Sequence, residues 1–132
     1  MYTMKQACEA TGMNYEALKF YCNEGLVPNV KRDKINRRVF DEHDIAWIKS
    51  LSCLKKCGMS LAEMKHYLAL CLEGKPTIPE RQIMLEEKRK HLLQELQEVQ
   101  ASLDYLDWKQ NLYNDVLSGK TEYVSNLIKV EK

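Results

Sequence analysis

Residues 13–40, MNYEALKFYCNEGLVPNVKRDKINRRVF, decide the fold of this chain. Asn14 is a residue type that caps helices well, and the residues after it predict a short helix. The segment 24–28, EGLVP, ends that helix because it contains both a Gly and a Pro. Lys31–Arg38 then holds five basic residues and one acidic residue, and Asn36 tolerates the left-handed backbone of a hairpin turn. A helix beside a cationic, two-stranded hairpin is a shape suited to DNA.

Another short helix precedes this stretch. We predict it over Tyr2–Ala10, because Thr3 and Gln6 have the spacing of a capping box. Gly12 provides the turn after it, and the next helix is expected over Tyr15–Asn23. Two short helices joined by a turn that contains Gly predict a helix-turn-helix.

Candidate DNA contacts lie on the second of these helices and on the hairpin. Side chains of such a helix reach base edges and phosphates, and basic hairpin residues grip the backbone or enter a narrow minor groove. Taken alone, the helix could be an ordinary solvated helix and the hairpin an ordinary solvated charged loop. Because the helix and the basic hairpin follow each other directly in the sequence, we favour DNA binding. The predicted DNA-binding residues are Asn14, Tyr15, Glu16, Lys19, Phe20, Tyr21, Lys31, Arg37 and Arg38.

Composition narrows the class of protein. The net charge is +1, so only the local concentration of basic residues indicates a partner. The five cysteines are an odd number, no secretory signal opens the chain, and no apolar run approaches the roughly 20 residues that a membrane helix needs. We therefore expect a cytoplasmic protein with reduced thiols, no membrane association, no cofactor and no bound metal.

Three more helices are predicted downstream. Asp41–Asp44 begins the first with acidic residues, which suit a helix N-terminus. Ser60 and Glu63 form the capping box of the next, which we expect to reach about Leu72. The last and longest helix opens near Thr77, after a break that contains Gly and Pro.

From Leu85 onward, seam positions follow one another at alternating spacings of four and three residues. This heptad seam is about 50 Å long, so a small domain cannot cover it, and a second copy is the simplest partner. The predicted dimerisation residues are Leu85, Leu92, Leu96, Val99, Leu103, Leu106, Tyr113 and Leu117. The expected division is a DNA-binding domain over 1–75, a dimerisation helix over 76–118 and a short tail over 119–132.

Four ordered segments match one known pattern. Residues 2–14, YTMKQACEATGMN, correspond to an opening helix and turn, and residues 17–28, ALKFYCNEGLVP, to a second helix and the loop after it. Residues 36–44, NRRVFDEHD, correspond to a wing, and residues 58–64, GMSLAEM, to the turn that opens a later helix. In this order and spacing they resemble the DNA-binding domain of the MerR family of bacterial transcription regulators.

The resemblance implies a mainly α fold, in which a winged helix-turn-helix domain precedes a long helix that pairs antiparallel in a homodimer. It also implies that the dimer, in response to a signal, bends and untwists promoter DNA so that RNA polymerase engages both promoter elements. Lys19, Phe20 and Cys22 stand where the family usually has Arg, Tyr and Glu, and Asn36-Arg37 replaces Gly-Tyr. Lys keeps the charge of Arg but loses its bidentate fork.

Cys53 resembles the proposed sensor thiol of the family branch that responds to aldehydes and electrophiles. Lys49 and Lys56 lie about one turn to either side and favour a thiolate. The alternative is a buried cysteine that acts as a small hydrophobic residue, and the sequence leaves both possibilities open.

Other functions are less consistent with the sequence. Metal sensors of the family place cysteines in segments that correspond to residues 77–84 and 118–125, and neither segment contains one. A soft-metal site from Cys53 and Cys57 with His66 or Cys71, and an unidentified small ligand, remain alternatives. A thiol enzyme would need a base and an oxyanion site beside the nucleophile, so we expect no enzyme. A coiled-coil adaptor would leave the basic hairpin unexplained.

Overall fold

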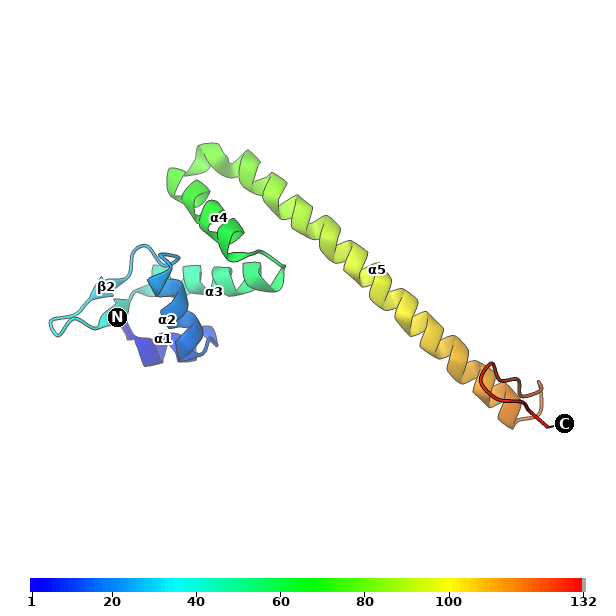
Figure 1. The fold of residues 1–132 in the computed structure, drawn as a ribbon. Helices are drawn as coiled ribbons and strands as arrows, with labels where there is room; N and C mark the ends of the chain where they lie inside the picture. Colours follow the sequence, from blue (N-terminus) through cyan, green and yellow to red (C-terminus); the bar gives the residue numbers. More distant parts are fainter. Residues whose placement is uncertain (132) are drawn as a thin grey trace. The chain divides into compact units, whose positions relative to one another are not determined.

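The computed structural model describes residues 1–131, which are mainly helical (Figure 1). These residues divide into two compact units, Met1–Lys90 and the residues from His91 onward. In chain order the elements are β1 (Tyr2–Thr3), α1 (Met4–Thr11), α2 (Tyr15–Asn23), β2 (Lys31–Arg32), β3 (Arg38–Phe40), α3 (Glu42–Lys56), α4 (Leu61–Glu73), the 3-10 helix η1 (Lys75–Thr77) and α5 (Ile78–Leu117). Within this described part, no helix is both long and apolar enough to span a membrane.

The first two helices form the predicted helix-turn-helix. The Thr3 hydroxyl accepts a hydrogen bond from the Gln6 N–H at 3.2 Å, and the Gln6 side chain accepts one from the Thr3 N–H at 3.0 Å. Gly12 ends α1 with a left-handed backbone, φ 74°, which costs Gly little. The Asn14 side chain accepts a hydrogen bond from the Ala17 N–H at 2.8 Å and begins α2 as predicted. These caps set the helix ends from local sequence.

The wing is a sheet of three strands in the order β1-β3-β2, all antiparallel. Asn36, in the turn between β2 and β3, has the predicted left-handed backbone with φ 63°. The expected helix start at Tyr2 is wrong, because Tyr2 pairs with Phe40 and the helix begins only at Met4. The hairpin therefore gains a third strand, whose partner lies almost 40 residues away in the sequence.

The core of the first unit lies beneath the helix-turn-helix and the wing. Leu18 of α2, Phe40 of β3 and Ile48 of α3 are all fully buried in one apolar cluster. Trp47 donates a hydrogen bond from its indole N–H to the Leu26 carbonyl at 2.7 Å, which fixes the loop after α2. The exposed face of α2 and the basic wing are therefore held on one folded support.

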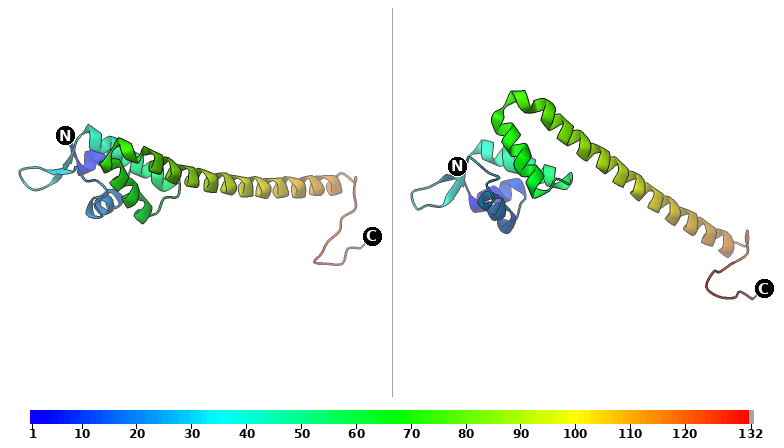
Figure 2. Two further views of the ribbon diagram at one scale, coloured as in Figure 1. Left: turned by 90° about the horizontal axis from the view of Figure 1, so that it is seen from above. Right: turned by 45° about the horizontal axis from the view of Figure 1, so that its top comes forward.

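The long helix α5 is unbroken, as the further views show (Figure 2). No residue of α5 is buried within the single chain, and every predicted seam residue is exposed. Leu96 is 63% exposed, and Leu117, at the end of the helix, is 85% exposed. The mainly α fold with a winged helix-turn-helix and a long C-terminal helix is confirmed.

Candidate DNA-binding surface

A basic groove runs between the wing, the start of α1 and the start of α2. Its volume is about 530 Å³. It is lined by Thr3, Met4, Lys5, Tyr15, Arg32, Asp33, Asn36, Arg37 and Arg38. Four of these side chains are basic and one is acidic, so the groove suits a polyanion.

The start of α2 lies beside this groove with most of the predicted contacts exposed. Tyr15 is 51% exposed and Phe20 is 46% exposed. The Lys19 ammonium lies 6.0 Å from the centre of the Tyr15 ring, so the cation and the aromatic face form one exposed pair. Glu16 is also exposed, whereas the Asn14 side chain is occupied by the cap of α2.

The two arginines of the wing have different environments. The side chain of Arg37 is 73% exposed, and its Nε lies 3.6 Å from a carboxylate oxygen of Asp33. Arg38 is half-buried, and its Nη2 donates a hydrogen bond to Asn23 Oδ1 at 2.6 Å. Arg38 therefore ties β3 to the end of α2, and Arg37 presents the freer guanidinium.

The two residues of β2 point to opposite faces, as successive strand residues do. Lys31 lies outside the lining of the groove and donates a hydrogen bond to Asp41 at 3.0 Å, which raises the pKa of Lys31. Arg32 lines the groove, and its Nη1 donates a hydrogen bond to the Asn36 carbonyl at 3.0 Å. Arg32 is not among the predicted contacts, although its position next to Lys31 in a predicted basic strand was the available signal.

Lys5 is a second groove residue that the sequence analysis missed. It lies in the first turn of α1, and only the pairing of β1 with β3 brings it to the wing.

Tyr21 was predicted to contact DNA, and this prediction is wrong. It is only 3% exposed, and burial raises the pKa of its hydroxyl, so we assign it to the core and not to the DNA surface. Tyr21 lies three residues after Leu18, so the two share one face of the helix, and this spacing was the available signal that Tyr21 is buried.

Cys53 on α3 is exposed, whereas Cys8, Cys22, Cys57 and Cys71 are half-buried. Burial raises the pKa of the Cys8 and Cys22 thiols, and both pack against the core. The alternative that Cys53 is a buried cysteine acting as a small hydrophobic residue does not fit its exposure. Among the residues that the structure describes, no three His, Cys, Asp or Glu side chains gather to hold a metal ion.

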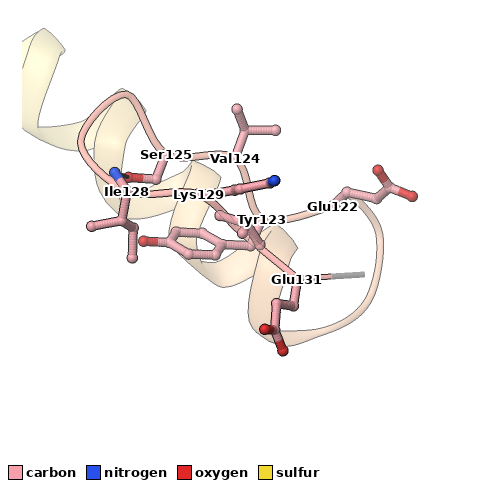
Figure 3. Close-up of a pocket in the computed structure, with 8 residues that line it drawn as sticks. Glu122, Tyr123, Val124, Ser125, Ile128, Lys129 and Glu131 are labelled. Carbon is pink, nitrogen blue, oxygen red and sulfur yellow. Dashed lines mark hydrogen bonds between the residues drawn. The ribbon is translucent and has the colours of Figure 1, made fainter.

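The tail contains a separate hollow of about 540 Å³ (Figure 3). Its lining mixes aromatic and apolar side chains such as Tyr123 and Ile128 with Glu122, Glu131 and one basic residue, Lys129. It lacks the gathered positive charge of the groove, so the groove is the stronger candidate site.

Comparisons with known proteins place the chain in a family. The model described as "MerR HTH family regulatory protein" matches residues 2–71, and the model described as "MerR, DNA binding" matches residues 45–109. An uncharacterized HTH-type transcriptional regulator of Haemophilus influenzae is 38% identical over 85% of this chain and 83% of its own length. The HTH-type transcriptional regulator AdhR of Bacillus subtilis is 33% identical over 67% of this chain and 64% of its own length.

Solved structures agree with this assignment. HiNmlR, described as a MerR family regulator lacking the sensor domain, bound to promoter DNA, matches with a TM-score of 0.77 and 35% identity over 91% of each chain. A MerR family regulator described as putative, from Listeria monocytogenes, matches with a TM-score of 0.79 and 29% identity, again over 91% of each chain. These relatives are transcriptional regulators and not enzymes. The chain therefore belongs to the MerR family of DNA-binding transcriptional regulators.

Proposed function

We propose that this protein acts as a homodimer in the bacterial cytoplasm, where it binds promoter DNA and controls transcription by RNA polymerase. The observation that carries the proposal is the basic groove beside the exposed face of α2. The likeness to HiNmlR, a protein described as bound to promoter DNA, supports the same use of this surface.

The proposed DNA contacts divide by chemistry. Arg37, Arg32 and Lys5 supply charge to the groove and contact phosphates, which position the protein on the duplex. The exposed residues of α2 reach base edges and the adjoining backbone. Lys31 and Arg38 act mainly by holding the wing, because each is bound to another side chain.

The proposed dimer uses α5. Its seam is exposed along the whole helix, and an apolar stripe of this length needs a partner. We retain residues 1–75 as the DNA-binding region, 76–118 as the dimerisation helix and 119–132 as the tail. An antiparallel pair of α5 helices would join two DNA-binding surfaces, which suits a near-palindromic site.

The proposed signal is a reactive aldehyde or another electrophile sensed at Cys53. Its exposed thiol is accessible, and the buried Leu51 lies two residues away on the same helix, so modification would occur close to the core. With an aldehyde, the sulfur forms a bond to the carbonyl carbon, the carbonyl π electrons move to oxygen, and the thiol proton passes to that oxygen. The product is a hemithioacetal, and no oxidant is required.

Regulation then follows as a shift between two states of the protein–DNA complex. Bending and untwisting a promoter costs energy that depends on the DNA sequence. A modified Cys53 changes the balance only if modification stabilises the distorted complex more than the undistorted one.

DNA binding is tested by measuring the affinity for a duplex from the promoter of its own gene at several salt concentrations. Steep salt dependence is expected, because phosphate contacts release counterions. Arg37→Ala should weaken binding to all duplexes and reduce the salt slope by about one unit. The exposed Lys90, outside the groove, provides the control Lys90→Ala, which removes the same charge. A shallow slope for the native protein, or equal effects of both variants, would contradict the proposal.

Sensing is tested by transcription in vitro from the same promoter, with and without formaldehyde. Induction should occur with the native protein and with Cys57→Ser but not with Cys53→Ser. Cys57 is the matched control, because it is the C-cap residue of α3, one turn after Cys53, and is half-buried. A response by all three proteins would exclude Cys53 as the sensor, and a response by none would leave another small ligand or a soft metal as the signal.

A further inference from the structure

The chain turns between α4 and α5 at an elbow, which comprises residues 70–81. The 3-10 helix η1 connects the two helices and contacts the end of α4. Side chains of the elbow and of the next turns of α5 join α5 to α4.

Thr77 is the centre of the elbow. Its hydroxyl lies 2.6 Å from the Leu70 carbonyl and 2.8 Å from the Gly74 carbonyl, and its single proton is donated within reach of both oxygens, the Leu70 oxygen being nearer. The last carbonyls of a helix have no partner within the helix, so Thr77 satisfies a group that α4 leaves open at Leu70. Thr77 is only 9% exposed, which makes the loss of this hydrogen bond costly.

Arg81, in the first turns of α5, completes the elbow from the other side. Its Nε donates to the Thr77 hydroxyl at 3.0 Å, and its Nη2 donates to the Gly74 carbonyl at 2.7 Å. Its Nη1 lies 3.7 Å from Cys71 Sγ. One planar guanidinium thus joins α5 to η1 and to the C-terminal end of α4, where a positive charge is favoured.

A second tie lies two turns farther along α5. The Lys88 ammonium is 2.8 Å from Glu63 Oε2, and the hydrogen bond from Lys88 lowers the pKa of Glu63. Glu63 belongs to the capping box at the start of α4. On the same helix, Lys65 binds Glu24, the C-cap residue of α2, at 2.8 Å. Ion pairs therefore connect α2 to α4 and α4 to α5.

We propose that Arg81 is a positioning residue, whose guanidinium fixes the direction of α5 at the elbow and so sets the spacing of the two DNA half-sites that a homodimer engages. The half-site part rests on the proposed function, whereas the elbow part does not. Arg81 is not a member of the apolar core, so its loss should loosen the direction of α5 without unfolding the core.

The elbow is tested directly by pulsed electron paramagnetic resonance on the full-length protein. Spin labels are placed at Ala69 of α4 and Glu87 of α5 through unnatural amino acids, because the chain has five cysteines. Unlabelled protein in excess ensures that distances within one chain are measured. We expect a narrow distance distribution for the native protein and for Lys90→Gln, and a broad one for Arg81→Gln. Equal widths in all three proteins would overturn the proposal.

The consequence for DNA is tested with a duplex that the native protein selects from a random pool. The centre of this duplex is then lengthened or shortened by one base pair. In Arg81→Gln the affinity penalty for the altered spacing should fall by about fivefold or more, the lower end of ordinary coupling between two sites. A uniform loss of affinity that preserves the penalty would show a merely structural role for Arg81 and overturn the proposal.

A second variant, and the independence of the resonance test from DNA binding, keep the proposal testable if one experiment fails. Arg81→Lys retains the positive charge but not the planar, multiply donating guanidinium, so it should also broaden the distance distribution. This variant replaces Arg81→Gln in the test if Arg81→Gln folds poorly. If the native protein selects no duplex, the proposed function fails, and the resonance result still decides whether Arg81 holds the elbow.

Discussion

At the scale of the residue, Asp41 shows how one side chain joins several parts of the wing. It caps α3 by accepting a hydrogen bond from the Asp44 N–H at 2.8 Å, and it also accepts one from Lys31 at 3.0 Å. The Asp44 N–H first, and Lys31 second, lower the pKa of Asp41 from 3.8 to about 2. The carboxylate therefore stabilises the folded state above the unfolded pKa and loses this effect as the pH falls toward 2.

This shift predicts the pH dependence of one substitution. Asp41→Asn should lower the urea midpoint at pH 6, where Asp41 of the native protein is charged, and the difference from the native protein should shrink between about pH 4 and pH 2. The exposed Asp107, on α5, provides the control Asp107→Asn. A difference from the native protein that is the same at both ends of this range would mean that the Asp41 charge does not contribute to stability.

At the scale of the element, the turn of the wing depends on one left-handed residue. Asn36 has φ 63°, and the carboxylate of Asp33 accepts hydrogen bonds from the N–H groups of Ile35 and Arg37 at 3.0 and 2.9 Å. These bonds lower the pKa of Asp33 and close the turn across its own backbone. The guanidinium of Arg37 is thereby held at the rim of the groove.

Two substitutions at Asn36 separate backbone strain from loss of the side chain. Asn36→Gly keeps the left-handed backbone available, so stability and low-salt DNA affinity should change little. Asn36→Val should cost about 1–2 kcal/mol, because a β-branched residue resists this conformation. Urea unfolding measures the difference. Equal stability of the Gly and Val variants would show that the turn does not require its left-handed residue.

At the scale of the whole molecule, the seam of α5 predicts that assembly is sensitive to one charge. Leu96 is 63% exposed in the single chain but would be covered in the proposed dimer. Leu96→Asp should weaken dimerisation by about a hundredfold or more, which corresponds to ~3 kcal/mol for an unpaired charge in an apolar interface. Sedimentation equilibrium at micromolar concentration provides the measurement. Its neighbour Gln97 lies off the seam, so Gln97→Asp should remain dimeric. A fully dimeric Leu96→Asp protein would refute the seam.

Those features of this protein that depend on local rules could be predicted from its residues in order. Asn14 and Ser60 start helices where starts were predicted, and Thr3 forms the predicted capping box, because a capping side chain bonds backbone groups only three residues away. The left-handed Asn36 is equally local. The basic hairpin and the heptad seam follow from residue type and spacing alone.

Which of these residues share a surface depends on contacts between distant segments. The pairing of Tyr2 with Phe40 turned a predicted helix start into a strand and brought Lys5 to the groove. Packing placed Tyr21 in the core, where its phenol ring is removed from water. The elbow at Arg81 likewise depends on carbonyls exposed by the end of another helix. Each outcome rests on contacts between segments distant in space or sequence, so local periodicity could not reveal it.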